Sequence, residues 1–278
     1  MEGFDIVGEL TGHVKDSAEF HFPWGHMHIP GFLVDIGITK YVVLQMIVAV
    51  AMVAVFTTMA AKMRGGQPVK GRFWNMFEAM LVYLRDNVIV PSIGNPKDAA
   101  PYIPYLWTLF FFVLFCNLLG MVPWMGTATS AITVTATLAI CTFIIVVTVG
   151  ISRHGPIGFW LGMTPHVEGK VGPINLATVL GPVLFALEIC SFFLKHFTLS
   201  IRLMATMFGG HLMLAVFFAF IPMAAGSVYA VYVFVPVTVG ALTAALAVSF
   251  LELLISCIQA YVFTILTAIY IGMSIHQH

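Results

Sequence analysis

The sequence predicts an all-α membrane protein. We expect about five membrane-crossing helices and one interfacial amphipathic helix, with the last two crossing helices long, tilted and paired as a hairpin. Three observations lead to this fold class. Of the 278 residues, 60% are hydrophobic and only 9% are charged, whereas a soluble globular protein carries roughly 25% charged residues. The mean hydropathy is +1.00. Apolar runs of about 20 residues, the length that crosses a bilayer, recur along the chain.

Most of the surface must therefore face lipid, which argues against a secreted enzyme, a nucleic-acid binder or a disordered scaffold. Twelve basic and twelve acidic residues give a formal net charge of zero, so no polyanionic partner such as nucleic acid is expected. Four cysteines lie in apolar runs without metal-ligand spacing, and we expect them to fill space inside helices. No cofactor and no metal are expected.

Residues 1–38 are predicted to form a polar extracytoplasmic arm. No secretory signal pattern is seen, since the first long apolar run begins near Thr39. The arm contains an HxxxxHxH cluster of His21, His26 and His28, which could bind a metal ion. No carboxylate or cysteine completes a convincing ligand set, so a solvated arm over the membrane surface is favoured.

Residues 39–278 are predicted to form a single membrane domain. The first three spans are expected at 39–61, 102–122 and 131–151, each ended by a charged residue or a proline. Between the first two spans, residues 71–94 carry apolar side chains at helical spacing with charges on the other side. This pattern favours an amphipathic helix on the membrane surface over an ordinary soluble helix.

The last two helices are expected at 176–220 and 228–274. Each exceeds the length that crosses a bilayer upright, which predicts tilt or a local break. Residues 1–38 hold six acidic residues and one lysine, whereas residues 62–72 hold four basic residues and no acidic one. Because positive loops favour the cytoplasm, we expect the N-terminus outside and the C-terminus in the cytoplasm.

Only four charged side chains occur in the last 108 residues: Glu188, Lys195, Arg202 and Glu252. A charge deep in a bilayer costs about 2.5–3.5 kcal/mol on insertion scales, so such groups face a wet cavity or a partner and mark ion paths. Glu188, Lys195 and Arg202 are spaced seven apart, which places them with Ser191 on one helix face.

His211 follows Arg202 by nine residues and is expected on the opposite face of the same helix. A second polar stripe in the last helix has 3-4-3 spacing and consists of Ser249, Glu252, Ser256 and Gln259, with Tyr270 roughly in line. A lone serine often bonds back to its own helix, and a glutamine can hold two helices together. A glutamate flanked by three polar neighbours favours a proton or ion path.

At this point the sequence resembles a known family. The run LSIRLMATMFGGH at 199–211 is similar to the signature of subunit a of the F-type rotary ATP synthase, and IQAYVF at 258–263 resembles its second signature. Two further stretches, 75–79 and 115–123, also match. The resemblance covers about residues 70–275.

The resemblance implies roles for individual positions. Arg202 matches the essential arginine that faces the rotating ring of c subunits, and Gln259 matches the glutamine close to it. His211 and Glu252 match the pair associated with the half-channel on the positive side of the membrane. Glu188 matches an acidic position of the other half-channel. Further residues expected along the proton path are Lys195, Asn117, Thr206, Ser249 and Ser256.

The sequence departs from the family pattern in three places. Thr206 stands where an asparagine is common, and Met204-Ala205 stands where Phe-Gly is common. The stretch 195–197 (Lys-His-Phe) lies where a proline often occurs. The arginine and the glutamine are intact, so the implied function is unaffected, whereas the polar lining near Arg202 can differ.

The resulting prediction is a proton-translocating stator subunit of the ATP synthase membrane sector in the bacterial plasma (inner) membrane. The expected partners are the c-subunit ring, b-type peripheral stalk subunits, the rest of the complex and the lipid bilayer. The chain itself is expected to be non-catalytic, because it has no phosphate-binding GxxxxGK[ST] loop. The alternative is a secondary transporter that binds an anionic substrate at Arg202, although no internal repeat supports it. A purely structural membrane subunit would not need aligned ionisable stripes.

Overall fold

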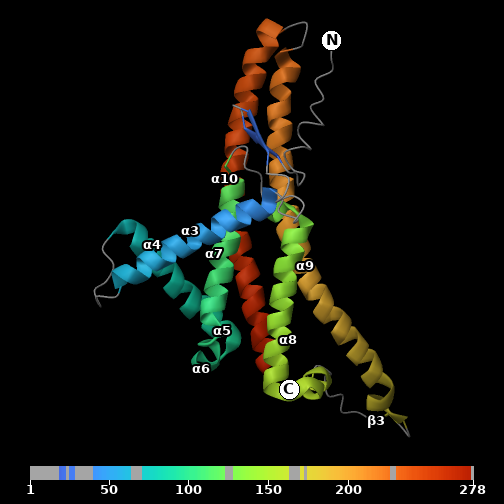
Figure 1. The fold of residues 1–278 in the computed structure, drawn as a ribbon. Coiled ribbons are helices and arrows are strands. Elements are labelled where there is room, and N and C mark those ends of the chain that lie inside the picture. The colour runs from blue at the N-terminus through green and yellow to red at the C-terminus, as the bar shows by residue number, and fades with distance from the viewer. Residues whose placement is uncertain are drawn as a thin grey trace. The chain divides into compact units, whose positions relative to one another are not determined.

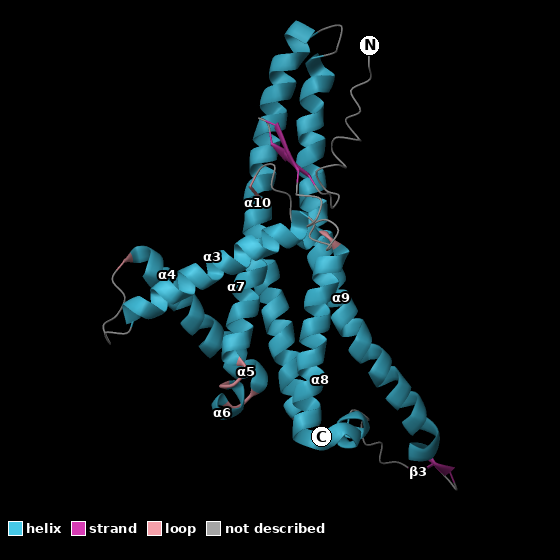
Figure 2. Ribbon diagram, viewed as in Figure 1, coloured by secondary structure: helices cyan, strands magenta, loops and turns pink. Residues whose placement is uncertain are grey.

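A computed structural model describes residues 19–22, 25–28, 40–63, 71–122, 128–162, 170–171, 174–225 and 230–276. Nearly all of these residues are helical (Figures 1 and 2). Within the predicted arm, strands β1 (Glu19–Phe22) and β2 (Gly25–His28) pair antiparallel, with His21 opposite His26. The rest of that arm lies outside the described residues. A second short ribbon pairs β3 (Lys170–Val171) with β4 (Ile174–Asn175).

Five helices in the described part of the chain are long and apolar enough to cross a membrane. This confirms the predicted all-α membrane fold class. The last two helices are also the longest, at 50 and 46 residues. The five are α3 (Lys40–Met63), α7 (Ile103–Gly120), α8 (Ile132–Gly162), α9 (Leu176–Ala225) and α10 (Ala230–Ile275).

The chain divides into two compact units, and several helices contribute to both. The first unit comprises residues 1–69, 110–135 and 203–261. Here the Phe56 ring of α3 meets the edge of Phe111 on α7, with 5.0 Å between ring centroids. After α7, the short 3₁₀ turn η2 (Ala128–Ser130) precedes α8. Its Thr129 hydroxyl donates a 2.8 Å hydrogen bond to the Asn117 side-chain oxygen, whereas the Asn117 side-chain nitrogen is buried without a hydrogen-bond partner among the described residues.

The second unit comprises residues 70–109, 136–202 and 262–278. Its first helical stretch falls within the segment predicted as an interfacial helix and consists of α4 (Arg72–Tyr83), a π-helical turn η1 (Leu84–Ile89) and α5 (Val90–Ile93). Phe73 and Met76 of α4 are exposed while Phe77 is buried, as expected for an amphipathic helix. The short α6 (Pro96–Ala99) follows, and the Trp107 indole N–H anchors α7 to the Leu81 carbonyl oxygen at 3.1 Å.

Helix α8 runs beyond the third predicted span, whose end was expected at residue 151. Gly155 has φ 77° and ψ 165°, a backbone conformation with positive φ that only glycine adopts without strain, and Pro156 follows it. These two residues break the helix, and a short further helical segment continues to Gly162. The apolar run ends at Arg153 and His154, just before this break. Hydropathy alone therefore predicts an earlier end of the helix.

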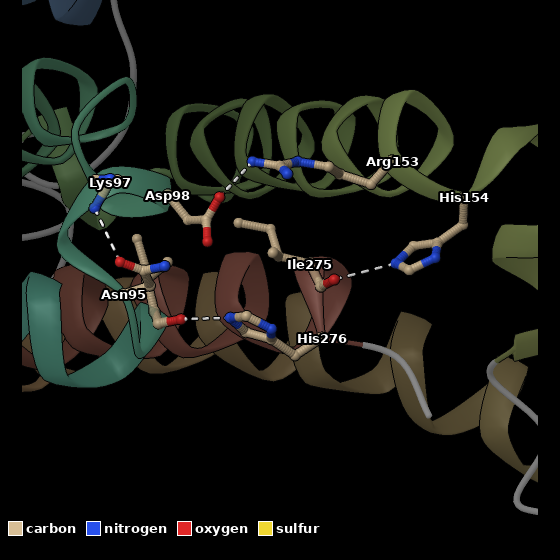
Figure 3. A network of polar contacts seen from close by, with 8 residues as sticks. Asn95, Lys97, Asp98, Arg153, His154, Ile275 and His276 are labelled. Atoms are coloured by element: carbon tan, nitrogen blue, oxygen red, sulfur yellow. Dashed lines mark hydrogen bonds and ion pairs between the residues drawn. The ribbon is translucent and has the colours of Figure 1, made fainter.

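The C-terminal end of α10 is held by polar contacts within the second unit (Figure 3). A side chain at position 272 would collide with the backbone of Ser92, so glycine there lets α10 approach the end of α5. Three side-chain contacts surround this end: Arg153 donates to Asp98 (2.7 Å), the His154 ring bonds the carbonyl oxygen of Ile275 (3.1 Å), and the His276 ring bonds that of Ile93 (2.9 Å). The two histidine contacts fix the part of α10 that includes Tyr270, whereas the Arg153–Asp98 bond involves no atom of α10.

Candidate functional site

Arg202 lies on α9 in the second unit and is exposed. Beside it is an open cavity of about 460 Å³, which we call the arginine cavity. Leucine side chains form its apolar wall. Its polar and sulfur-bearing lining consists of Cys190, Ser191, Lys195, Thr198, Arg202 and Tyr270. The first five belong to α9: Ser191, Lys195, Thr198 and Arg202 recur every three or four residues, and Cys190 is adjacent to Ser191, so one side of this helix supplies them.

Glu188 does not line the arginine cavity but contacts a residue that does. Its Oε1 lies 3.8 Å from Nζ of Lys195, and both side chains are about one-third exposed. Such a partly exposed pair contributes on the order of 1 kcal/mol or less to stability. The ion pair matters mainly for the charge of the cavity. The Glu188 carboxylate offsets the charge of Lys195, so the net positive charge of the cavity wall is that of Arg202.

A second, much smaller cavity lies in the first unit, and we call it the glutamate cavity. Its volume is about 10 Å³, which is roughly the room that one water molecule needs. Residues of α9 and α10 line it together with Met121, which directly follows α7. Its principal lining residues are Met121, Thr206, Gly210, His211, Glu252 and Ser256.

Among the residues that the structure describes, Glu252 is the only carboxylate lining the glutamate cavity, and it is just 7% exposed. Within the described part of the chain, its Oε1 has no hydrogen-bond partner. Gly210 explains how the carboxyl group reaches α9, because a Cβ there would lie 2.5 Å from that same oxygen. A buried, unpaired carboxyl oxygen is costly to keep, so its presence points to a role in exchange with water.

The structure brings together part of the predicted set. Lys195 and Arg202 share the arginine cavity, and Thr206, His211, Glu252 and Ser256 share the glutamate cavity. The other four predicted residues, Glu188, Asn117, Ser249 and Gln259, line neither cavity. Of these, the Ser249 hydroxyl donates to the Ala245 carbonyl oxygen at 2.9 Å, Asn117 bonds Thr129, and Gln259 is buried.

Tyr270 is a cavity residue that the site prediction omitted. It lines the arginine cavity from α10, whereas the sequence only placed it roughly in line with the stripe of Glu252 and Gln259. The signal was its spacing of eleven residues from Gln259, which is close to three helical turns. Tyr270 reaches the arginine cavity because α10 packs against α9, and the spacing of residues along α10 alone does not indicate that packing.

We expect Gly210→Val to destabilise the protein by about 1–3 kcal/mol, the usual cost of overpacking. The valine side chain would displace the Glu252 carboxyl group. The matched control is Gly209→Val, because a Cβ at position 209 meets nothing within 4 Å. Both variants add the same β-branched residue to the same helix, so the change in helix propensity is the same in both and cancels when their stabilities are compared. Thermal unfolding in detergent should show the lower Tm for Gly210→Val, and equal Tm values would contradict the close approach of Glu252.

Comparison with known proteins identifies relatives over most of the chain. A family model described as ATP synthase A chain matches residues 42–272. A protein of Chloroherpeton thalassium named ATP synthase subunit a is 36% identical over 270 residues, covering 95% of this chain and 75% of the relative. Proteins of the same name from Myxococcus xanthus and Hyphomonas neptunium are 35% and 36% identical, over 260 and 233 residues. Those two alignments cover 90% and 83% of this chain, and 78% and 85% of the respective relatives.

Proposed function

We propose, since this chain belongs to the ATP synthase subunit a family, that it is the proton-translocating stator subunit of the enzyme's membrane sector. Family membership and five apolar helices make it a multi-pass protein of the bacterial inner membrane. In this proposal the c-subunit ring turns against α9 and α10. Peripheral stalk subunits of the b type hold the chain still, and the rest of the complex converts rotation into ATP.

The observation that carries the proposal is the exposed Arg202 beside an open polar cavity. A guanidinium group keeps its charge in any protein environment, whereas a buried lysine can lose its proton. A positive charge beside a carboxyl group favours the ionised form of that group. Arg202 would therefore cause each ring carboxyl that reaches it to release its proton.

The arginine cavity supplies a route for the released proton toward the cytoplasm. Its hydroxyl groups, Ser191, Thr198 and Tyr270, can hydrogen-bond water, and the cavity is large enough for several molecules. The nearby Glu188–Lys195 pair can accept and donate protons at its margin. The fixed charge of Arg202 also opposes the direct passage of a proton from one half-channel to the other.

His211 and Glu252 are proposed to serve the half-channel on the positive side. Both line the glutamate cavity, together with the hydroxyl groups of Thr206 and Ser256. An imidazole and a carboxyl group in one small polar cavity can pass a proton through a single water. The N-terminus is proposed to lie on this positive side and the C-terminus in the cytoplasm, following the charge bias of the loops.

The proposal is tested by omitting the chain from otherwise complete ATP synthase. Inside-out membrane vesicles should then hydrolyse ATP without acidifying their interior, and restoring the chain should restore acidification, measured with a pH-sensitive fluorescent dye. Acidification that persists without the chain would overturn the proposal. The chain alone in liposomes should move no organic anion, and specific anion uptake would favour the secondary-transporter alternative.

A further inference from the structure

His196 follows Lys195 on α9 and is a buried residue, only 5% exposed. Its Nδ1 lies 3.0 Å from the carbonyl oxygen of Phe192. A carbonyl oxygen can only accept a hydrogen bond, so Nδ1 carries a hydrogen there. In the neutral ring Nε2 is then an acceptor. Among the residues that the structure describes, no group bonds this Nε2.

Three aromatic rings enclose the imidazole. Phe143 of α8 and Phe192 of α9 meet it edge-on, with centroids 5.2 Å and 5.0 Å away. Tyr270 of α10 lies against it at 5.1 Å with an interplanar angle of 42°. Tyr270 also lines the arginine cavity, whereas His196 does not. The imidazole therefore lies directly behind one wall of that cavity.

The chemistry of this position calls for a hydrogen-bond donor, and the described residues provide none to Nε2. A phenylalanine would fill the aromatic enclosure without burying an unpaired nitrogen, so packing alone does not explain an imidazole here. Of the three rings that contact it, only Tyr270 carries a donor group, and among the described residues no group, the Tyr270 hydroxyl included, bonds Nε2. Water is the donor that an adjacent hydrated cavity supplies.

We propose that Nε2 of His196 accepts a hydrogen bond from a water molecule held behind Tyr270, which makes His196 a positioning residue for proton release. The Nδ1–Phe192 bond fixes the ring, and the fixed ring orders a water at the edge of the arginine cavity. This inference rests on the proposed function, because it places the ordered water on the route of the released proton.

Three substitutions separate the water-ordering role from simple packing. His196→Gln retains a polar atom near the position of Nε2, and His196→Asn retains one only near the position of Nδ1. His196→Phe retains the ring alone. Proton pumping, normalised to the amount of assembled complex, should stay within about twofold of wild type for His196→Gln. It should fall at least about fivefold for His196→Asn and His196→Phe.

A packing role predicts the opposite order, with His196→Phe the most active variant. Wild-type pumping by His196→Phe, or equal losses in His196→Gln and His196→Asn, would overturn the inference. If His196→Phe does not assemble, the comparison of His196→Gln with His196→Asn decides. Arg202→Ala, assayed in parallel, separates the two proposals. Wild-type pumping by Arg202→Ala contradicts the proposed function. An inactive Arg202→Ala together with a fully active His196→Phe contradicts only the role of His196.

Discussion

Arg202→Ala is expected to abolish ATP-driven proton pumping, with a loss of at least about a hundredfold. Two unit charges 4 Å apart interact by about 4 kcal/mol at an effective dielectric constant of 20. Because about 1.4 kcal/mol is a factor of ten, losing this interaction removes up to about a thousandfold preference for the ionised ring carboxylate. Arg202 is exposed on its helix, so truncating it leaves no large void and assembly should continue.

The measurement is acidification of inside-out vesicles on addition of ATP, with the assembled complex quantified separately. Arg153→Ala is a matched control, because Arg153 is an exposed arginine of the same unit that bonds Asp98 outside the arginine cavity. The control should pump near the wild-type rate. Arg202→Lys should remain strongly impaired, since an ammonium group loses its proton more readily than guanidinium. Undiminished pumping by Arg202→Ala would refute the stator role.

The membrane fold could be predicted because a protein surface that faces lipid has to consist mostly of apolar residues. A chain in which 9% of residues are charged has to place most of its surface in lipid, and α3, α7, α8, α9 and α10 follow from runs of apolar residues. The ends of these helices were less predictable. Hydropathy reports where the apolar run ends, whereas the Gly155–Pro156 break depends on backbone conformation.

The cavities could be predicted only in part. Seven-residue spacing grouped Glu188, Lys195 and Arg202 on one helix, and of these Lys195 and Arg202 line the arginine cavity whereas Glu188 does not. Spacing placed Ser249 in the polar stripe, although its hydroxyl bonds its own helix, which is the alternative that a lone serine allows. It also missed His196, whose significance arises from burial among rings of three helices.

Glu252→Gln is expected to lower proton pumping by about a hundredfold. Glutamine keeps the size of the side chain and its contact with Gly210 but cannot exchange a proton. A positioned general acid or base contributes typically about 10²–10⁴-fold, and Glu252 is the only carboxyl group lining the glutamate cavity. Stability should not fall, because the substitution removes an ionisable group from a site where one carboxyl oxygen lacks a partner among the described residues.

Activity and stability should therefore separate in this variant, a result that a structural role for Glu252 does not predict. Thr243→Ala is a suitable control on the same helix, since Thr243 is exposed and, among the described residues, its hydroxyl bonds only the Val239 carbonyl oxygen of that helix. It should pump normally. Exchanging the pair, with His211→Glu and Glu252→His in one chain, should recover part of the pumping that Glu252→Gln loses, because a carboxyl group and an imidazole again share the cavity. Full pumping by Glu252→Gln would show that protons reach the ring by another route.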